Sequence, residues 1–284
     1  MNLRKIEIRR NVDLKKYTSI KIGGRADCLF VVSTIRALRQ VIKKTAFEFY
    51  VLGKGSNLLI TDRVIKKPIV MLSESFTYIE QNDDNFKIGA STPLSFLIKY
   101  CLKNNLAGLE NLVGIPATVG GLLVMSASSF GVNIASCLQE IEAINRKGEL
   151  ETLKKSNIVF GYRSSSLEDY VILGAKFRLS KQAALRQKIK DLLKKRLDSQ
   201  DFDFPSCGSI FKNPKEFAAG FLIDSCGLKG LRKANAQVSN KHANFIINLG
   251  TAKYKDVDYL IQKIKDKVHK RYGIILQEEI KRWS

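Results

Sequence analysis

The stretch "FEFYVLGKGSNLLITD", residues 47–62, joins two short apolar runs through a turn that contains two glycines. Just before it, "STIRALRQVIKK" (33–44) repeats apolar residues at helical spacing, and Ser33 is a candidate N-cap for that helix. A helix followed by strand, turn and strand predicts a β-α-β opening to the fold.

The turn within 47–62 places Gly53 and Gly55 directly after a strand. Glycine reaches positive φ and carries no Cβ, so backbone N–H groups in such a turn can converge on an anion. The third glycine of a dinucleotide fingerprint is replaced by Leu58, and no P-loop lysine follows at the right spacing. The turn is therefore either a plain β-turn or part of an anion site.

Two further Gly-rich loops, "TSIKIGGRAD" (18–27) and "IPATVGG" (115–121), occur in the chain. The second lies within 108–131, a segment rich in Gly, Ala and Ser and low in charge, which indicates that another group packs against its backbone. Three such loops together predict a cradle for a long, phosphate-bearing cofactor.

The rest of the chain alternates between strand-like and helical patterns. Residues 140–180 read as strands, 181–198 as a connecting helix, and "IILQEEIKRW" as a closing strand. The last helix presents one apolar face and ends at Gly273, a typical C-terminal cap; the face comprises Val257, Leu260, Ile261, Ile264, Val268 and Tyr272. This order predicts an α+β fold with several small layers rather than one doubly wound sheet.

Composition narrows the class of protein. The chain has 284 residues, 45% of them hydrophobic, which is enough for a substantial core. Five scattered cysteines and two histidines argue against a disulfide framework or a metal site. The charged start "MNLRKIEIRR" lacks an apolar region, and no apolar run is long enough for a bilayer, so we expect a soluble, cytoplasmic protein.

The formal net charge of +21 raises the alternative of a nucleic-acid-binding protein. The Lys and Arg residues are spread along the whole chain, and the densest run, "KQAALRQKIKDLLKKRLDSQ", has Leu and Ile at helical spacing. We interpret them as solvated helix faces, whose positive field would equally attract small polyanions such as nucleotides.

The loop "PSCGSIFKNP" (205–214) concentrates a thiol, two hydroxyls and an ammonium group. Cys207 is the obvious nucleophile by residue type, and Ser209 by itself would be a loop hydroxyl bonded to its own turn. Residue type alone leaves the chemistry of this loop open.

Seven motifs occur in a fixed order: "TSIKIGG", "VLGKGSNLLITD", "GIPATVGG", "FGYRSSSL", "PSCGSIFKNP", "GLKGLRKANAQVSNKHANFIIN" and "LQEEIK". Over nearly its whole length the chain resembles UDP-N-acetylenolpyruvoylglucosamine reductases, the flavoenzymes called MurB, and its short length and "PSCGS" loop are similar to their compact type II branch. The resemblance implies an FAD-binding fold of the vanillyl-alcohol-oxidase/MurB type, in which two α/β subdomains hold FAD, plus a C-terminal α+β substrate domain. The expected boundaries are 1–66, with 274–284 as a candidate addition, then 67–182 and 183–284.

The resemblance also implies an activity, that of a UDP-N-acetylmuramate dehydrogenase. NADPH reduces FAD, and the reduced flavin converts UDP-N-acetylglucosamine enolpyruvate into UDP-N-acetylmuramate, a peptidoglycan precursor needed for cell-wall synthesis, cell shape and division. We therefore expect small molecules as the binding partners, and neither nucleic acid nor a membrane. We also expect a monomer.

Site residues carry over by motif position. Ser209 would be the proton donor that complements hydride from flavin N5, a mechanism with no use for Cys207. Arg163 would lie beside the substrate carboxylate, and Glu279 would orient or polarise a donor, whereas its neighbour Glu278 is interpreted as structural. The implied cofactor-binding residues are Gly53, Lys54, Gly55, Ser56, Asn57, Ile115, Pro116, Thr118, Gly120 and Gly121. The implied substrate-binding residues are Tyr162, Arg196, Lys212, Asn213 and Gln237.

The chain departs from the family pattern at several positions near the implied flavin site. Ala117 stands where the family commonly has glycine, and Met125-Ser126-Ala127-Ser128 stands in place of Met-Asn-Ala-Gly. These changes bear on FAD contacts, whereas Arg163, Ser209 and Glu279 are all present. The alternative enzyme is another FAD oxidoreductase of the same fold superfamily, which would have no need of a carbon-protonating serine.

Overall fold

The structure, a computed structural model, describes residues 6–284; residues 1–5 of the expected first subdomain and of the charged N-terminal stretch lie outside this part. The chain forms two compact units. Unit 1 contains the residues up to Arg10, Cys28–Lys54 and Lys67–Lys195, and unit 2 contains Asn11–Asp27, Gly55–Lys66 and Arg196–Ser284. Each unit combines separate stretches of sequence, and the three-domain division at residues 66 and 182 stays a prediction.

The first sheet has the strand order β1-β2-β5-β3. Its strands are β1 (Ile6–Asp13), β2 (Arg25–Val32), β5 (Ile69–Leu72) and β3 (Tyr50–Val51), and β5 pairs in parallel with both β2 and β3. Helix α1 (Ile35–Thr45) connects β2 to β3 and buries Leu38 and Val41 in the core of unit 1. The predicted N-cap was wrong by one residue: the side chain of Thr34, not Ser33, accepts from Ala37 N at 3.2 Å, because the helix begins at Ile35.

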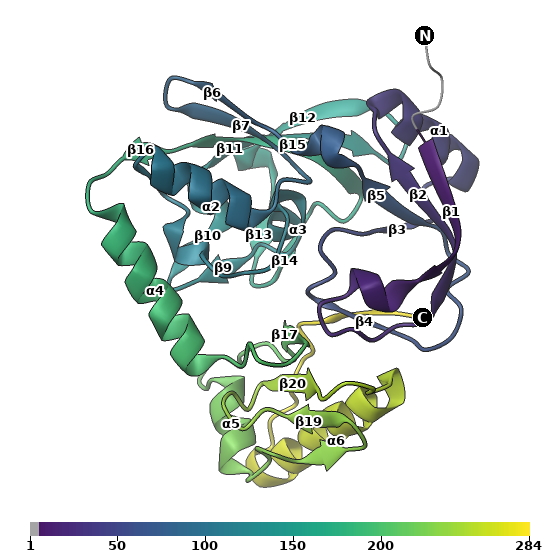
Figure 1. The fold of residues 1–284 in the computed structure, drawn as a ribbon, viewed down its shortest axis with the longest axis vertical. Helices are drawn as coiled ribbons and strands as arrows, with labels where there is room; N and C mark the ends of the chain where they lie inside the picture. Colours follow the sequence, from purple (N-terminus) through teal and green to yellow (C-terminus); the bar gives the residue numbers. More distant parts are fainter. Residues whose placement is uncertain (1–5) are drawn as a thin grey trace. The chain divides into compact units, whose positions relative to one another are not determined.

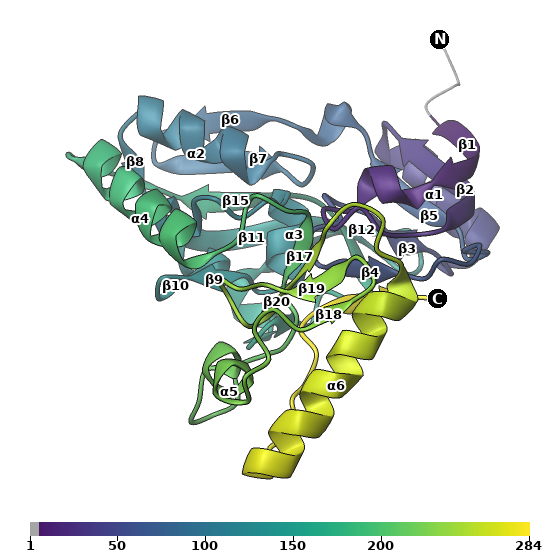
Figure 2. The ribbon, with the colours of Figure 1, turned by 60° about the horizontal axis from the view of Figure 1, so that its bottom comes forward.

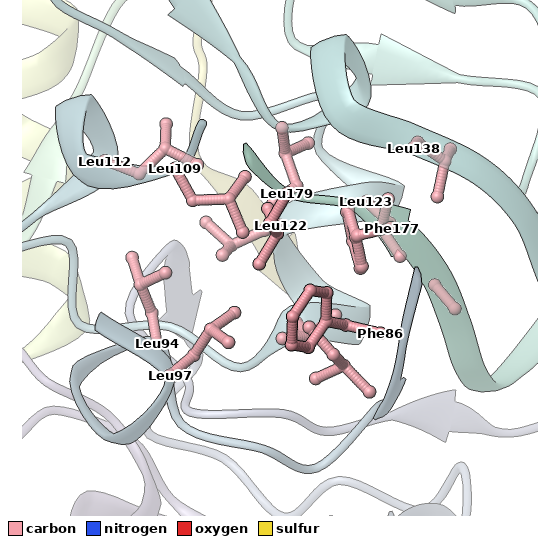
Figure 3. Close-up of a cluster of buried hydrophobic side chains, with 14 of the residues drawn as sticks. Phe86, Leu94, Leu97, Leu109, Leu112, Leu122, Leu123, Leu138, Phe177 and Leu179 are labelled. Atoms are coloured by element: carbon pink, nitrogen blue, oxygen red, sulfur yellow. The ribbon is translucent and has the colours of Figure 1, made fainter. Parts of the chain in front are cut away.

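The second sheet of unit 1 is antiparallel, with the order β12-β11-β15-β7-β6. Its strands are β6 (Ile79–Asn82), β7 (Asn85–Gly89), β11 (Leu138–Asn145), β12 (Leu150–Lys154) and β15 (Tyr170–Arg178). Helices α2 (Leu94–Lys103) and α3 (Val119–Val124) contribute leucines to one core with Phe86 and Phe177, which are register partners on β7 and β15 (Figure 3).

Shorter elements complete unit 1 (Figure 1). Three two-stranded pairs are β8 (Leu106–Ala107) with β16 (Ser180–Lys181), β9 (Ser128–Ser129) with β10 (Val132–Asn133), and β13 (Phe160–Gly161) with β14 (Ser164–Ser165). Single 3-10 turns are η2 (Glu74–Phe76), η3 (Glu110–Leu112), η4 (Ile134–Cys137) and η5 (Lys155–Asn157).

Unit 2 is built on the antiparallel sheet β17-β20-β19-β18. Its strands are β17 (Ser206–Ser209), β18 (Arg232–Lys233), β19 (Ala236–Val238) and β20 (Phe245–Asn248). Helices α5 (Ala219–Ser225) and α6 (Tyr254–Tyr272) share the hydrophobic core of this unit with the sheet, and α6 contacts β18 and β19. Figure 1 shows α6 beside β19, and Figure 2 shows it beside β18.

The apolar face predicted for the last helix is confirmed. Five of its residues are completely buried, and Tyr272 is half-buried; the five are Val257, Leu260, Ile261, Ile264 and Val268. Gly273 has φ 69° and donates its N–H to His269 O at 2.8 Å, as expected of a C-terminal cap. Helical spacing was sufficient to predict the buried face, because this helix packs one side against a single hydrophobic core.

Unit 2 also gathers segments from both ends of the chain. The 3-10 turn η1 (Leu14–Tyr17) belongs to it, and β4 (Leu58–Ile60) pairs in parallel with the last strand, β21 (Lys281–Trp283). Ile60 and Trp283 are register partners, and both are buried. Helix α4 (Leu185–Ser199) is the connecting helix predicted over 181–198, and residue 195 is where the chain leaves unit 1. Among residues 6–284, no helix meets the length and hydropathy that a bilayer span requires.

Candidate active site

The Ser209 loop contains a β-bulge that separates its two reactive side chains. In a regular strand, residues 207 and 209 would face the same side of the sheet. The pairing of β17 with β20 instead shifts register between Ser206 and Ser209, and Gly208 adopts φ 75°. As a result, Cys207 is 1% exposed and lies in the core of unit 2, while Ser209 is half-buried.

Burial also determines the chemistry of Cys207. Desolvation raises the pKa of this thiol to about 12, so it stays protonated at neutral pH. A protonated thiol is a poor nucleophile, and this one is enclosed by apolar side chains. The most conspicuous reactive group of the loop is therefore a core residue, which leaves the hydroxyl of Ser209 as the group available for chemistry.

Glu279 reaches the Ser209 loop through a backbone hydrogen bond. Its N–H donates to Ile210 O at 2.8 Å, and the preceding residue, Glu278, forms an isolated β-bridge with Phe211. Asn57 joins the same group: its Nδ2 donates to Glu279 O at 3.1 Å, and its carbonyl accepts from Lys281 N at 2.9 Å. Unit 2 thus assembles three predicted site residues, Asn57, Ser209 and Glu279, from three distant parts of the sequence.

Glu278 and Glu279 are adjacent, but their surroundings differ. Glu278 Oε2 lies 2.6 Å from Arg282 Nε, and its Oε1 lies 2.5 Å from Lys265 Nζ. Burial by itself would raise the pKa of Glu278, yet the hydrogen bonds from Arg282 and Lys265 outweigh it and hold the pKa below its ordinary value. Glu278 therefore forms part of an ion-pair network, while Glu279 is half-buried and attached through its backbone to the Ser209 loop.

Asn244 is the residue whose part in this site the sequence did not reveal. It is 3% exposed, accepts from Phe211 N at 2.9 Å with Oδ1, and donates to Phe211 O at 2.8 Å with Nδ2. Its own carbonyl accepts from Ile210 N at 2.9 Å. Asn244 lies within the motif "GLKGLRKANAQVSNKHANFIIN", but nothing in that motif indicated that it fixes the two residues directly after Ser209.

Two of the predicted substrate-binding residues also hold local structure. Lys212 N donates to Gln277 O at 2.8 Å, which ties the loop to the segment leading to Glu279. Asn213 Oδ1 accepts from Ala219 N at 2.9 Å and so supports the first turn of α5. The side chain of Asn213 therefore already has a structural task in this unit.

Gln237 and Arg196 lie elsewhere in unit 2. Gln237 is half-buried on β19, where its register partner Ile247 also pairs with Ser206 of β17. Arg196, in the last turn of α4, is 8% exposed, and burial lowers the pKa of its guanidinium. Its Nη1 donates to Gln200 Oε1 at 3.1 Å, whereas the neighbouring Lys195 is exposed.

Arg163 and Tyr162 form the turn between β13 and β14 in unit 1. Arg163 has φ 56°, the left-handed region, and its Nη1 donates to Ser128 Oγ at 2.8 Å and to Ser128 O at 3.1 Å. Tyr162 is 50% exposed, and its ring centroid lies 5.4 Å from the guanidinium carbon of Arg163. Ser128, one of the departures from the family pattern, is thus a direct partner of Arg163.

The 53–57 loop has the properties that an anion cradle requires. In the described part of the chain, the backbone N–H groups of residues 53–56 have no protein acceptor. Gly55 has φ 63°, and a Cβ there would lie 1.9 Å from Tyr17 O, so only glycine fits. Consecutive unpaired N–H groups in a glycine turn suit phosphate oxygens, and Gly53, Lys54, Gly55 and Ser56 therefore fit a phosphate-bearing cofactor. Asn57, by contrast, is engaged with Glu279 and Lys281.

The 115–121 loop is different, because its N–H groups are already used within unit 1. Val119 N donates to Thr92 O at 3.0 Å and Gly120 N to Ala90 O at 2.9 Å. Thr118 caps α3, its Oγ1 accepting from Gly121 N at 3.4 Å. Ile115 is half-buried and Pro116 is exposed. A cofactor would meet this loop through side chains and carbonyls rather than through a nest of N–H groups.

The two predicted cofactor loops approach each other at one point of unit 1. A Cβ on Gly53 would lie 2.9 Å from Thr118 Oγ1, so the absence of a side chain at 53 permits this approach. No group of three or more His, Cys, Asp or Glu residues among residues 6–284 is arranged to hold a metal ion.

Two known domain families match this chain. Residues 27–154 match an FAD binding domain, and residues 200–283 match the C-terminal domain of UDP-N-acetylenolpyruvoylglucosamine reductase. An FAD-binding domain together with the C-terminal domain of a reductase is the domain composition of a flavoprotein oxidoreductase.

The full-length relatives are more specific. The UDP-N-acetylenolpyruvoylglucosamine reductase of Syntrophobacter fumaroxidans is 38% identical over 98% of this chain and 84% of its own length. That of Chlamydia felis is 40% identical over 96% of this chain and 94% of its own length. The crystal structure of MurB from Thermus caldophilus matches with a TM-score of 0.85 at 32% identity, covering 98% of this chain and 99% of that one. The chain belongs to the UDP-N-acetylenolpyruvoylglucosamine reductase family.

Proposed function

We propose that this protein reduces UDP-N-acetylglucosamine enolpyruvate to UDP-N-acetylmuramate, a step of peptidoglycan precursor synthesis, with FAD as cofactor and NADPH as reductant. The observation that carries the proposal is the backbone bond from Glu279 N to Ile210 O, which brings a carboxyl-bearing residue beside the Ser209 loop. Membership of the reductase family supplies the reaction, and this local geometry supplies residues able to perform it.

When bound, FAD supplies the hydride that it has taken from NADPH. The chain's own contribution to the reduction is a proton, which we assign to the hydroxyl of Ser209. The carbon that accepts it has carbanion character and is strongly basic, so an ordinary alcohol is acidic enough to serve. The assignment is supported by the half-buried position of Ser209 and by the enclosure of Cys207 in the core.

Charge accumulates on the substrate carboxylate during the reduction, and cationic groups stabilise it. We assign this role to Arg163, and with it Arg196, because a guanidinium can hold a carboxylate through two parallel hydrogen bonds and keeps its charge. Glu279 orients or polarises a donor beside Ser209. Lys212, Asn213, Gln237 and Tyr162 complete the proposed substrate contacts.

FAD would be held by backbone N–H groups of residues 53–56 at its phosphates, with Asn57 and the surface of the 115–121 loop as further contacts. We further propose that the enzyme acts as a monomer in the cytoplasm on small molecules alone, without binding membranes or nucleic acids. Five free cysteines agree with a reducing compartment.

The visible spectrum of the purified protein tests the function. We expect a yellow preparation whose flavin band is bleached by NADPH without oxygen and restored by UDP-N-acetylglucosamine enolpyruvate. A colourless protein that takes up no FAD would exclude the proposal. A flavin that is re-oxidised by oxygen but ignores the UDP-sugar would favour another FAD oxidoreductase of the same fold.

Replacing Ser209 with alanine tests the proton donor. Ser209→Ala is expected to be reduced by NADPH at a normal rate, but re-oxidation by the UDP-sugar should slow by about 10²–10⁴-fold, the usual contribution of a positioned general acid. Stopped-flow absorbance separates the two half-reactions. Ser206→Ala, on the same strand, is the control and should retain both rates; near-normal turnover of Ser209→Ala would contradict the assignment.

A further inference from the structure

Arg163 and Ser128 connect two β-hairpins of unit 1. Arg163 occupies the turn between β13 and β14, and Ser128 opens the β9–β10 hairpin. Arg163 Nη1 donates to both oxygens of Ser128, at 2.8 Å to Oγ and 3.1 Å to the carbonyl. A single nitrogen thus contacts two acceptors on one residue, so Ser128 is one of the groups that position the guanidinium.

The residues next to Ser128 are held in place by hydrogen bonds of their own. Asn133 Nδ2 donates to Ser126 O and to Ser126 Oγ, both at 3.0 Å, and Ser126 is 1% exposed. On the other hairpin, Ser165 Oγ donates to Val124 O at 2.8 Å, at the end of α3. The two hairpins are therefore both attached to the end of α3 or to the residues directly after it. The bond between Arg163 and Ser128 connects the hairpins to each other as well.

Ordering the long side chain of Arg163 costs rotamer entropy, and the two hydrogen bonds from Nη1 to Ser128 offset part of that cost. A hydrogen bond from a charged donor is stronger than a hydrogen bond between neutral groups. Any residue at 128 could accept such a bond through its backbone carbonyl, and the hydroxyl of Ser128 accepts a second one. Alanine or glycine at 128 would keep the carbonyl acceptor and lose the hydroxyl.

We propose that Ser128 is a positioning residue for Arg163, whose hydroxyl sets the orientation in which the guanidinium meets the substrate carboxylate. The inference rests on the proposed function, in which Arg163 contacts that carboxylate. The departure from the family pattern at 128 then has a role in substrate reduction, and none in the binding of FAD or in its reduction by NADPH.

A double-mutant cycle tests this positioning role. The rates of flavin reduction by NADPH and of re-oxidation by saturating UDP-N-acetylglucosamine enolpyruvate are measured for wild type, Ser128→Ala, Arg163→Ala and the double variant. We expect Ser128→Ala to slow re-oxidation about tenfold in the wild-type background, leave reduction by NADPH within about twofold, and change re-oxidation less than twofold in the Arg163→Ala background. Ser156→Ala, an exposed serine of the same unit, is the matched control.

Each outcome separates the inference from the proposed function. If wild type is not re-oxidised by the UDP-sugar, the proposed function fails and the inference fails with it. If wild type turns over normally and Ser128→Ala does the same, only the inference fails. Equal slowing by Ser128→Ala in both backgrounds, slowing of both half-reactions, or loss of bound FAD would show a general structural role and would also overturn it.

Discussion

At the scale of single residues, the "PSCGSIFKNP" loop shows how one backbone irregularity assigns roles to side chains. The bulge at Gly208 directs Cys207 into the core and leaves Ser209 half-buried. The amide of Asn244 then fixes both backbone groups of Phe211, so the part of the loop that follows Ser209 is anchored at buried positions. The reactivity of this loop is thus set by burial more than by the intrinsic nucleophilicity of its atoms.

The first prediction concerns Cys207. Because burial raises its pKa to about 12 and leaves the side chain 1% exposed, Cys207 should resist iodoacetamide in the native protein at pH 8. Mass spectrometry after short labelling should find the half-buried Cys137 and Cys226 modified well before it. Rapid labelling of Cys207, or loss of activity that follows its labelling, would show that the loop opens and that the thiol is accessible.

At the scale of elements, the last strand is attached to unit 2 by a network of charges. Arg282 contacts Glu278 and also donates to Asp258 Oδ1 at 2.6 Å and to Tyr254 Oη at 2.7 Å, both on α6. Lys265, about two helical turns after Asp258 on α6, contacts Oε1 of Glu278. These pairs hold β21 and the segment carrying Glu279 against the helix.

The second prediction is a pH dependence that comes from this network. The folded-state pKa of Glu278 lies below its ordinary value of 4.5, so its ionised form stabilises the fold above about pH 4.5 and this stability is lost as the pH falls through the lowered folded-state value. Glu278→Gln should therefore cost about 1–2 kcal/mol at pH 7 and show a smaller loss of stability on acidification than wild type.

Urea unfolding at a series of pH values between 7 and 3 measures both effects. The exposed Glu216, also in unit 2, provides the control variant Glu216→Gln, which should follow the wild-type curve. If Glu278→Gln loses stability on acidification as steeply as wild type, the network contributes nothing to the pH dependence.

At the scale of the whole molecule, the chain builds separate cores from interleaved segments. The core of unit 2 combines Ile20 and Ile22 from near the N-terminus, Leu59 from the strand after the glycine turn, and residues of the C-terminal third. Unit 1 takes its cores from the intervening segments. The stability of the part that carries Ser209 and Glu279 therefore depends on residues far from both in sequence.

The third prediction uses the single tryptophan, Trp283, which lies in unit 2 and is 5% exposed. Its fluorescence should report the unfolding of unit 2. Trp283→Ala should destabilise this unit by about 3–5 kcal/mol, the usual cost of truncating a buried aromatic side chain, and Trp283→Phe by clearly less. Circular dichroism during urea unfolding measures both variants. A loss below about 1 kcal/mol for Trp283→Ala would mean that burial of the Trp283 side chain adds little to the stability of unit 2.

Much of the local structure could be predicted because it depends on neighbours in sequence. The buried face of α6, its cap at Gly273 and the helix over 33–44 all follow from helical periodicity and capping preferences. Ser33 and Thr34 are adjacent hydroxyl residues, and either side chain can accept a hydrogen bond from an N–H of the first helical turn. The sequence therefore did not determine which of the two is the N-cap.

Local sequence patterns did not predict which residues contact each other across the fold. The bonds from Asn57 to Glu279, from Asn244 to Phe211 and from Arg163 to Ser128 join residues that no periodicity relates. Ordered motifs predicted the site residues, but not what holds those residues in place. In the sequence Ser128 was a departure near the implied flavin site, and the structure shows its hydrogen bond from Arg163.

By itself, then, the sequence determined the elements, the family and the residue types available for chemistry, since helical and strand spacing and glycine turns act over a few residues. The tertiary structure alone decided which of those residues meet. A β-bulge buries Cys207 instead of Ser209, and a strand from the end of the chain pairs beside the glycine turn at 53–55. Such contacts depend on non-local burial and register, which no short stretch of sequence encodes.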